Sequence, residues 1–144
     1  MRGIALDAWA ILALLRGERP AVEIVGRYVN QAAAGKARLF ACTVNLGEVL
    51  YRLIQVEGAL EAHRHVAAFR AGPIEVVQAR EPLVMAAAEL KAAHPLSYAD
   101  AFAVATAREQ GATVLTGDPE ILALPRNVVR TRRIVRHARP AASP

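Results

Sequence analysis

Short apolar runs alternate with segments of helical periodicity along most of this chain, and this alternation limits the folds open to it. The runs at 3–6, 38–43, 74–77 and 112–116 have the length of buried strands. Glycine or proline ends most of the helical segments between them. Strands that alternate with helices are typical of a parallel sheet covered by helices on both faces. The sequence therefore predicts an α/β fold.

The helical segments set the predicted organisation of the chain. Helices are predicted at 8–15, 21–34, 45–56, 59–70, 82–93 and 98–110, with a last strand at 128–135. A chain of 144 residues is typical of one domain, large enough to bury about 68–70% of its unfolded surface. We place this single domain at 1–137 and predict that residues 138–144 form a disordered tail.

The composition indicates the cell compartment in which the protein is expected. No run approaches the roughly 20 apolar residues that span a bilayer. The apolar run at 8–15 is short and lacks a basic leader, so it is a poor signal peptide. The single cysteine, Cys42, lies in an apolar run and is predicted to be a core residue. These features predict a cytoplasmic protein without a membrane partner.

Positive charge is concentrated at the end of the chain. Six of the 18 basic residues follow Pro125 and none of the 13 acids follows Glu120, so residues 1–125 carry a net charge of −1. The six are Arg126, Arg130, Arg132, Arg133, Arg136 and Arg139. Such a strip can attract a polyanion such as RNA, with Arg126, Arg130, Arg132 and Arg133 as the candidate contacts. It can equally be a solvated edge strand whose arginines discourage edge pairing.

Four acids occupy strand ends and helix starts. Asp7 follows the first strand, Asp118 follows the strand ending near Thr116, and Glu48 and Asp100 lie in the first turns of predicted helices. Each has a structural explanation. Asp7 and Asp118 can be helix N-caps, 45–48 has capping-box spacing, and 97–100 resembles a capping box.

The joint pattern of these acids favours a second interpretation. In a parallel sheet, strand ends and the helix starts that follow them lie at one edge, so all four acids are predicted there. Clustered carboxylates repel one another and are stable together only with a proton or a cation. A site of oxygen ligands suits Mg²⁺ or Mn²⁺.

The motifs of other chemistries are missing from the sequence. There is no phosphate-binding P-loop, no G-x-S-x-G elbow, and no histidine at metal-site spacing with an acid or cysteine. Metal-assisted hydrolysis of a phosphate ester, with a nucleic acid as the predicted substrate, is the chemistry that remains.

The motifs around the four acids resemble those of PIN-domain ribonucleases, in particular the VapC-type toxins of bacterial toxin–antitoxin pairs. The matching stretches are I-A-L-D at 4–7, T-V-N-L-G-E-V at 43–49, L-S-Y-A-D-A-F-A-V-A-T-A at 96–107 and G-A-T-V-L-T-G-D at 111–118. The resemblance covers nearly the whole chain. It implies a PIN-like three-layer α/β/α sandwich with a central, mostly parallel sheet.

The resemblance also implies an activity and its residues. The chain would be an endoribonuclease that depends on Mg²⁺ or Mn²⁺ and acts as the toxin of a type II toxin–antitoxin pair. Asp7, Glu48 and Asp100 would be the main metal ligands, and Asp118 would bind metal directly or through water. Thr116 would support the site by hydrogen bonding. A cognate antitoxin and a homodimer are the implied partners.

The sequence departs from the family pattern at one position, and two other functions are compatible with parts of it. The family often has Ser or Thr two residues after the first Asp, whereas this chain has Trp9, which we predict to be a core or dimer contact. A non-catalytic PIN-like module that binds RNA or protein would keep the fold and use the acids as caps. A phosphoacceptor domain is disfavoured, because it requires paired acids at the first strand and a lysine near the last, and the lysines here are Lys36 and Lys91.

Overall fold

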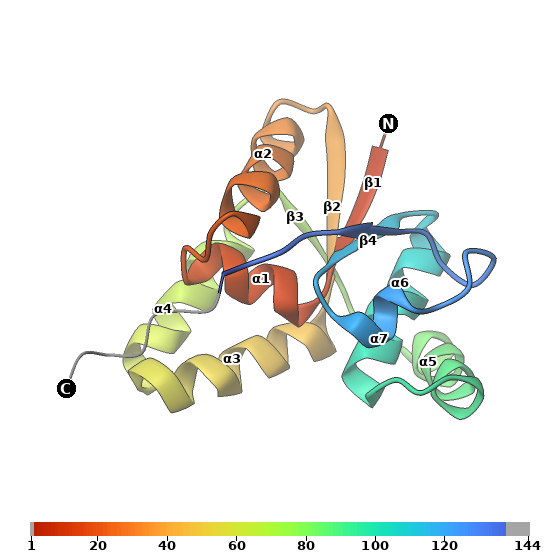
Figure 1. The fold of residues 1–144 in the computed structure, drawn as a ribbon. Helices are drawn as coiled ribbons and strands as arrows, with labels where there is room; N and C mark the ends of the chain where they lie inside the picture. Colours follow the sequence, from red (N-terminus) through yellow and green to blue (C-terminus); the bar gives the residue numbers. More distant parts are fainter. Residues whose placement is uncertain (1, 138–144) are drawn as a thin grey trace.

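Five parallel strands form the centre of the structure, a computed structural model that describes residues 2–137 (Figure 1). They are β1 (Arg2–Leu6), β2 (Ala37–Cys42), β3 (Ile74–Val77), β4 (Thr113–Thr116) and β5 (Thr131–Arg133). Their order in the sheet is β3-β2-β1-β4-β5. Every pairing is parallel, so the carboxyl ends of all five strands meet at one edge, which we name the carboxyl edge.

Helices cover both faces of this sheet. The larger layer holds α1 (Ala8–Leu15), α2 (Ala21–Ala33), α3 (Thr43–Glu57) and α4 (Ala59–Arg70), and the opposite layer holds α5 (Glu81–Ala93) and α6 (Tyr98–Gln110). A single short turn of helix, α7 (Pro119–Leu122), follows β4. The predicted three-layer sandwich is confirmed, and the sheet is parallel throughout the described residues.

Alternating side chains along the strands bind the two layers to the sheet. Ile4 and Leu6 of β1 pack into the core beneath α1 to α4, whereas Ala5 between them faces α5 and α6. All three are buried, which explains why β1 reads as a continuous apolar run and not as an alternating one. Burial on both faces holds β1 in place, so the residue that follows it has a defined position.

The topology fixes where the acids meet. From β1 the chain builds outward on one side through β2 and β3, then returns to pair β4 on the other side of β1. The direction in which successive strands are added to the sheet therefore reverses between the neighbours β1 and β4. Ligands of open α/β sheets bind beyond the carboxyl ends of the strands at such a switch point. Leu6 pairs with Leu115 in the register, which places Asp7 level with Thr116 at the carboxyl edge.

Helix α3 differs from its prediction at the N-terminus. It begins at Thr43, two residues before the predicted start, and its N-cap Cys42 makes no side-chain hydrogen bond. The predicted capping box is wrong, because Asn45 is a residue of the helix and not its cap. Its side chain is buried and donates from Nδ2 to the Ala99 carbonyl of α6 at 2.9 Å. Glu48 consequently lies in the second turn of α3.

The last strand is shorter than predicted. The sequence predicts a strand over 128–135, but β5 covers three residues, because its partner β4 has four and they pair only through Thr116. Cys42 is buried as predicted. The predicted tail at 138–144 lies outside the described residues. Within residues 2–137, no helix has the length and apolar character needed to cross a membrane.

Candidate metal centre

Asp7 is the most buried acid at the carboxyl edge. It follows β1 directly and caps α1, where Oδ1 accepts a hydrogen bond from the Ala10 backbone N–H at 2.8 Å. Oδ2 accepts a hydrogen bond from the Thr116 hydroxyl. Only 1% of Asp7 is exposed, and this burial raises its pKa from 3.8 to about 7, although both hydrogen bonds act to lower it. The cap prediction is confirmed for Asp7.

Thr116 connects Asp7 with Asp118. Its hydroxyl oxygen donates to Asp7 and accepts a hydrogen bond from the Asp118 backbone N–H at 2.9 Å. Thr116 is fully buried at the end of β4, so its bond to Asp7 is shielded from water, and its bond to Asp118 is partly buried. The single hydroxyl therefore sets the position of the first acid and of the turn that carries the last.

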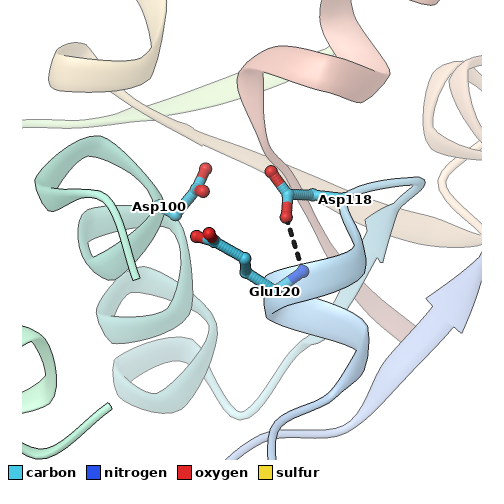
Figure 2. A group of neighbouring side chains, drawn as sticks. All are labelled: Asp100, Asp118 and Glu120. Carbon is cyan, nitrogen blue, oxygen red and sulfur yellow. Dashed lines mark hydrogen bonds between the residues drawn. The ribbon is translucent and has the colours of Figure 1, made fainter. Parts of the chain in front are cut away.

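Asp118 caps α7 through Oδ1, which accepts a hydrogen bond from the Glu120 backbone N–H at 2.8 Å (Figure 2). Pro119 occupies the first helical position, where its missing N–H costs nothing. A carboxylate has two oxygens, and the cap occupies one of them. Figure 2 shows the Asp118 carboxylate beside Asp100, so capping is compatible with a second role.

Asp100 faces Asp118 from the first turn of α6. Ser97 caps this helix by accepting a hydrogen bond from the Asp100 N–H at 3.1 Å, as its capping-box spacing predicts. Burial and the negative charges of Asp118 and Glu48 together raise the pKa of Asp100 to about 7, with burial as the largest cause. The Asp100 carboxyl thus lies where a second negative charge is unfavourable without a cation or proton.

Glu120 is an acid of this group that the sequence analysis did not single out. Asp100, Asp118 and Glu120 each offer one carboxylate oxygen, and these oxygens all lie within 4.8 Å of one another (Figure 2). Glu120 is exposed, and its position in the first turn of α7 brings it to the cluster. The available signal was the spacing of Asp118 and Glu120 across a first-turn proline, which places two acids at one helix start.

Glu48 reaches the same site from α3. It lines a cavity of about 170 Å³ that we name the acid cavity. The lining residues are Ala8, Trp9, Leu12, Glu48, Arg52, Asp100, Asp118 and Arg136. Glu48 accepts a hydrogen bond from Arg52 Nε at 2.9 Å and its side chain is 16% exposed. The bond from Asn45 to Ala99 joins α3 to the start of α6, the two helices from which Glu48 and Asp100 line the cavity.

The structure brings together all four acids that the sequence singled out. Glu48, Asp100 and Asp118 line the acid cavity, and Asp7 is close enough for the charges of Asp100 and Asp118 to raise its pKa. Four larger hollows, of about 490, 550, 250 and 460 Å³, contain none of these acids. The carboxylates at the carboxyl edge offer only oxygen donors, so they fit a hard divalent cation such as Mg²⁺ or Mn²⁺.

The predicted RNA-binding arginines lie elsewhere on the sheet. Arg126 and Arg130 line a hollow with Gly111 at the amino end of β4, and Arg130 donates to the Gly111 carbonyl at 3.2 Å. Arg132 donates to the Tyr28 hydroxyl and stacks on its ring. Arg133 is exposed on β5. None of these four lines the acid cavity.

The protein is thus an α/β sandwich with a parallel sheet between two helical layers. Its carboxylates form a candidate cation site at the switch point of the sheet. The PIN domain profile matches residues 4–127, and the chain therefore belongs to the PIN-domain family. The resemblance seen in the sequence is confirmed at the level of the family. No curated protein sequence matches this chain.

Solved structures with the same fold include toxin–antitoxin proteins. DNA-bound VapBC from Salmonella typhimurium superposes with a TM-score of 0.73 at 16% identity, covering 92% of this chain and 98% of that one. VapBC2 from Rickettsia felis, bound to a promoter DNA fragment, has a TM-score of 0.71 at 10% identity, with 91% and 98% covered. VapC20 from Mycobacterium tuberculosis, a sarcin–ricin loop cleaving toxin, has a TM-score of 0.68 at 22% identity, with 83% and 93% covered.

Proposed function

We propose that this protein is a metal-dependent endoribonuclease and the toxin of a type II toxin–antitoxin pair. The observation that carries the proposal is the convergence of Asp7, Glu48, Asp100 and Asp118 at the switch point of a PIN fold. A structure with this fold, VapC20, is described as a toxin that cleaves the sarcin–ricin loop, which supports RNA as the substrate class.

Asp7, Glu48, Asp100 and Asp118 would hold Mg²⁺ or Mn²⁺, with Glu120 as an additional oxygen donor at the exposed side. The bound cation would activate a water molecule and stabilise the leaving oxygen of the phosphodiester. The chain's own contribution is orientation. Hydrogen bonds from Ala10 and Thr116 fix both oxygens of Asp7. The backbone N–H of Glu120 fixes one oxygen of Asp118.

Burial adds an electrostatic contribution. Asp7 is excluded from water, so its negative charge is weakly screened and attracts a cation strongly. Protonation competes with the cation for the same oxygens, because the pKa of Asp7 and of Asp100 is raised to about 7. Cleavage should therefore increase with pH across neutrality.

An antitoxin partner is supported by the VapBC complexes that share this fold. The surface of α3 and α4 offers a place for a protein contact, because large apolar side chains are exposed there. Tyr51 is 50% exposed, Val56 61% and Leu60 66%. An antitoxin or a second copy of the chain would cover them.

RNA cleavage with and without the metal tests the proposed function. A labelled single-stranded RNA should be cut in Mn²⁺ or Mg²⁺ and left intact in EDTA. Asp7→Asn and Asp100→Asn should abolish cutting. Glu109→Gln is a matched control, because Glu109 is exposed near the opposite end of α6 from Asp100. Cutting in EDTA, or full activity in both aspartate variants, would contradict the proposal.

A non-catalytic PIN-like module that binds RNA or protein is the second candidate. Its supporting observation is that Asp7 and Asp118 do cap helices, so both have a structural role without a cation. Metal titration separates the two functions. Weak Mn²⁺ binding, together with RNA affinity that survives Asp100→Asn, would favour the binding module.

A further inference from the structure

Arg136 enters the acid cavity from beyond β5. Its guanidinium carbon lies 4.6 Å from the centre of the Trp9 ring, and Nη1 donates to Glu18 Oε1 at 2.9 Å. The backbone around it is anchored to the loop between α1 and α2, because residue 136 forms a β-bridge with Pro20 and the His137 N–H donates to the Arg19 carbonyl at 2.9 Å. Contacts of both backbone and side chain therefore hold Arg136 beside the acids.

Trp9 is itself fixed by the turn that carries Asp118. A Cβ atom at Gly117 would lie within 2.7 Å of three atoms of the Trp9 ring, so the indole rests directly on the Gly117 backbone. The ring also packs against the core under α1 to α4, and the guanidinium of Arg136 stacks on it. The indole thus packs between the Gly117 backbone and the Arg136 guanidinium. Because Asp118 follows Gly117, this packing holds the guanidinium at a fixed position relative to Asp118.

Two arginines line the acid cavity, and they differ in the acid that each one pairs with: Glu48 lines the same cavity, whereas Glu18 does not. Arg52 donates through Nε to Glu48. Arg136 donates through one nitrogen to Glu18, which is only 8% exposed, whereas the Arg136 side chain is 34% exposed. A guanidinium has five N–H donors. Within residues 2–137, Glu18 is the only hydrogen-bond partner of the Arg136 side chain, so donors remain for a ligand.

We propose that Arg136, stacked on Trp9, binds a phosphate of the RNA strand next to the phosphodiester that is cut. This inference rests on the proposed function, which supplies the RNA and the position of the cut. A polyanion that approaches three carboxylates is repelled unless cations lie beside them. Arg136 supplies such a cation at the wall of the cavity, and its planar donors match the geometry of phosphate oxygens.

The opposing explanation is that Arg136 only fastens the end of the chain to the loop before α2. Its ion pair with Glu18 and its stacking on Trp9 would then be purely structural. The two explanations give opposite expectations for Glu18→Gln. A fastening role requires Glu18, so that variant should behave like Arg136→Gln. A phosphate-binding role does not, and removal of a nearby negative charge should leave RNA affinity unchanged or tighter.

Anisotropy of a fluorescein-labelled single-stranded RNA 12-mer measures the contact without cleavage. The titrations use Asp100→Asn protein in EDTA over a series of salt concentrations. Adding Arg136→Gln should weaken binding about 5- to 10-fold and reduce the salt slope by about 0.7, the value for one phosphate contact on a single strand. Adding Arg136→Lys should retain the slope. Arg70→Gln is the matched control, because Arg70 is exposed in the last turn of α4, before β3 and far from the carboxyl edge.

Trp9 fluorescence gives a second readout at the site itself, because Trp9 is the only tryptophan in the chain. RNA should change the Trp9 emission of the Asp100→Asn protein, both without a further substitution and with Arg70→Gln. This change should be lost when Arg136→Gln is added. Circular dichroism and thermal unfolding establish that each variant is folded. If Arg136→Gln does not fold, Arg136→Lys and Glu18→Gln carry the test, since the proposal expects both to bind RNA.

Failure of this proposal is distinguishable from failure of the proposed function. If folded Arg136→Gln binds RNA with the affinity and salt slope of Arg70→Gln while the wild type still cuts RNA, the phosphate contact is wrong and the nuclease stands. If Glu18→Gln loses affinity as Arg136→Gln does, Arg136 only fastens the chain. If the Asp100→Asn protein does not bind RNA and the wild type does not cut it in Mg²⁺ or Mn²⁺, both proposals are overturned.

Discussion

Thr116 donates its hydroxyl hydrogen to Asp7 across 109 positions of the chain, and both side chains are buried at the carboxyl edge. The same oxygen accepts the N–H of Asp118. One hydroxyl therefore couples the acid after β1 to the acid after β4. This bond also acts against burial, because it lowers the pKa that desolvation raises.

Replacement of Thr116 by valine tests this coupling. Thr116→Val keeps a similar shape but leaves Oδ2 of Asp7 and the Asp118 N–H without a partner, which should cost about 1–3 kcal/mol of unfolding free energy. The pKa of Asp7 should rise further, because a hydrogen bond to its charged form is lost. Urea unfolding and the pH profile of cleavage measure the two effects. Thr116→Ser restores the hydroxyl, and equal behaviour of the two variants would contradict the role of this bond.

The raised pKa of Asp7 predicts how stability depends on pH without metal. Below about pH 4, Asp7 is protonated in both folded and unfolded chains, so it contributes nothing. Between about pH 4 and pH 7, the unfolded chain ionises while the folded one keeps its proton, so stability falls as pH rises. Above about pH 7 the full cost, on the order of 4 kcal/mol for Asp7, is present.

Urea unfolding in EDTA from pH 4 to pH 8 measures this dependence. Asp7→Asn cannot ionise, so its stability should vary less with pH than that of the wild type. A cation favours the ionised carboxylates, so added Mn²⁺ should stabilise the wild type most above pH 7. Wild-type stability that increases steadily from pH 4 to pH 8 in EDTA would contradict the raised pKa.

Much of the fold and three of the four predicted acids could be placed from sequence because their signals are local. Buried strands read as apolar runs, and Asp7, Asp100 and Asp118 lie in helix-start motifs that the structure confirms. Glu48 was predicted in the first turn of its helix and lies in the second, yet it lines the acid cavity with Asp100 and Asp118. The capping box that was its structural explanation does not form, because Asn45 makes a tertiary bond to α6 that no local pattern reveals.

The rest of the site depends on contacts between distant segments. The ion pair of Arg136 with Glu18 joins residues 118 positions apart, and strand order decides that they meet. The basic strip read as one feature in the sequence, yet Arg130 lies at the amino end of β4 and Arg136 beside the acids. A parallel strand carries residues from one edge of a sheet to the other within a few positions, so charge clustering in sequence did not predict clustering in space.

The acids should contribute unequally to metal binding, and Glu120 should contribute least. It is exposed, so water screens its charge, whereas Asp100 is partly buried and faces Asp118. Thermal unfolding at pH 8 with increasing Mn²⁺ measures the stabilisation by metal. Asp100→Asn should remove nearly all of it, and Glu120→Gln should weaken apparent affinity only a few-fold. A larger loss in Glu120→Gln than in Asp100→Asn would reverse this ranking.

The packing of Trp9 on Gly117 predicts a pair of mutations that compensate each other. Gly117→Ala forces a methyl group into the Trp9 ring and should destabilise the fold by about 1–3 kcal/mol. Trp9→Leu also destabilises, because the partly buried indole packs against the core. With the smaller leucine in place, however, the alanine methyl has room. The double variant should therefore be at least about 1 kcal/mol more stable than the sum of the single effects predicts.

Gly47→Ala is the control, because a Cβ at that position of α3 meets no atom within 4 Å, and its effect should be additive with Trp9→Leu. Strict additivity between Gly117→Ala and Trp9→Leu would show that the indole does not rest on the Gly117 backbone.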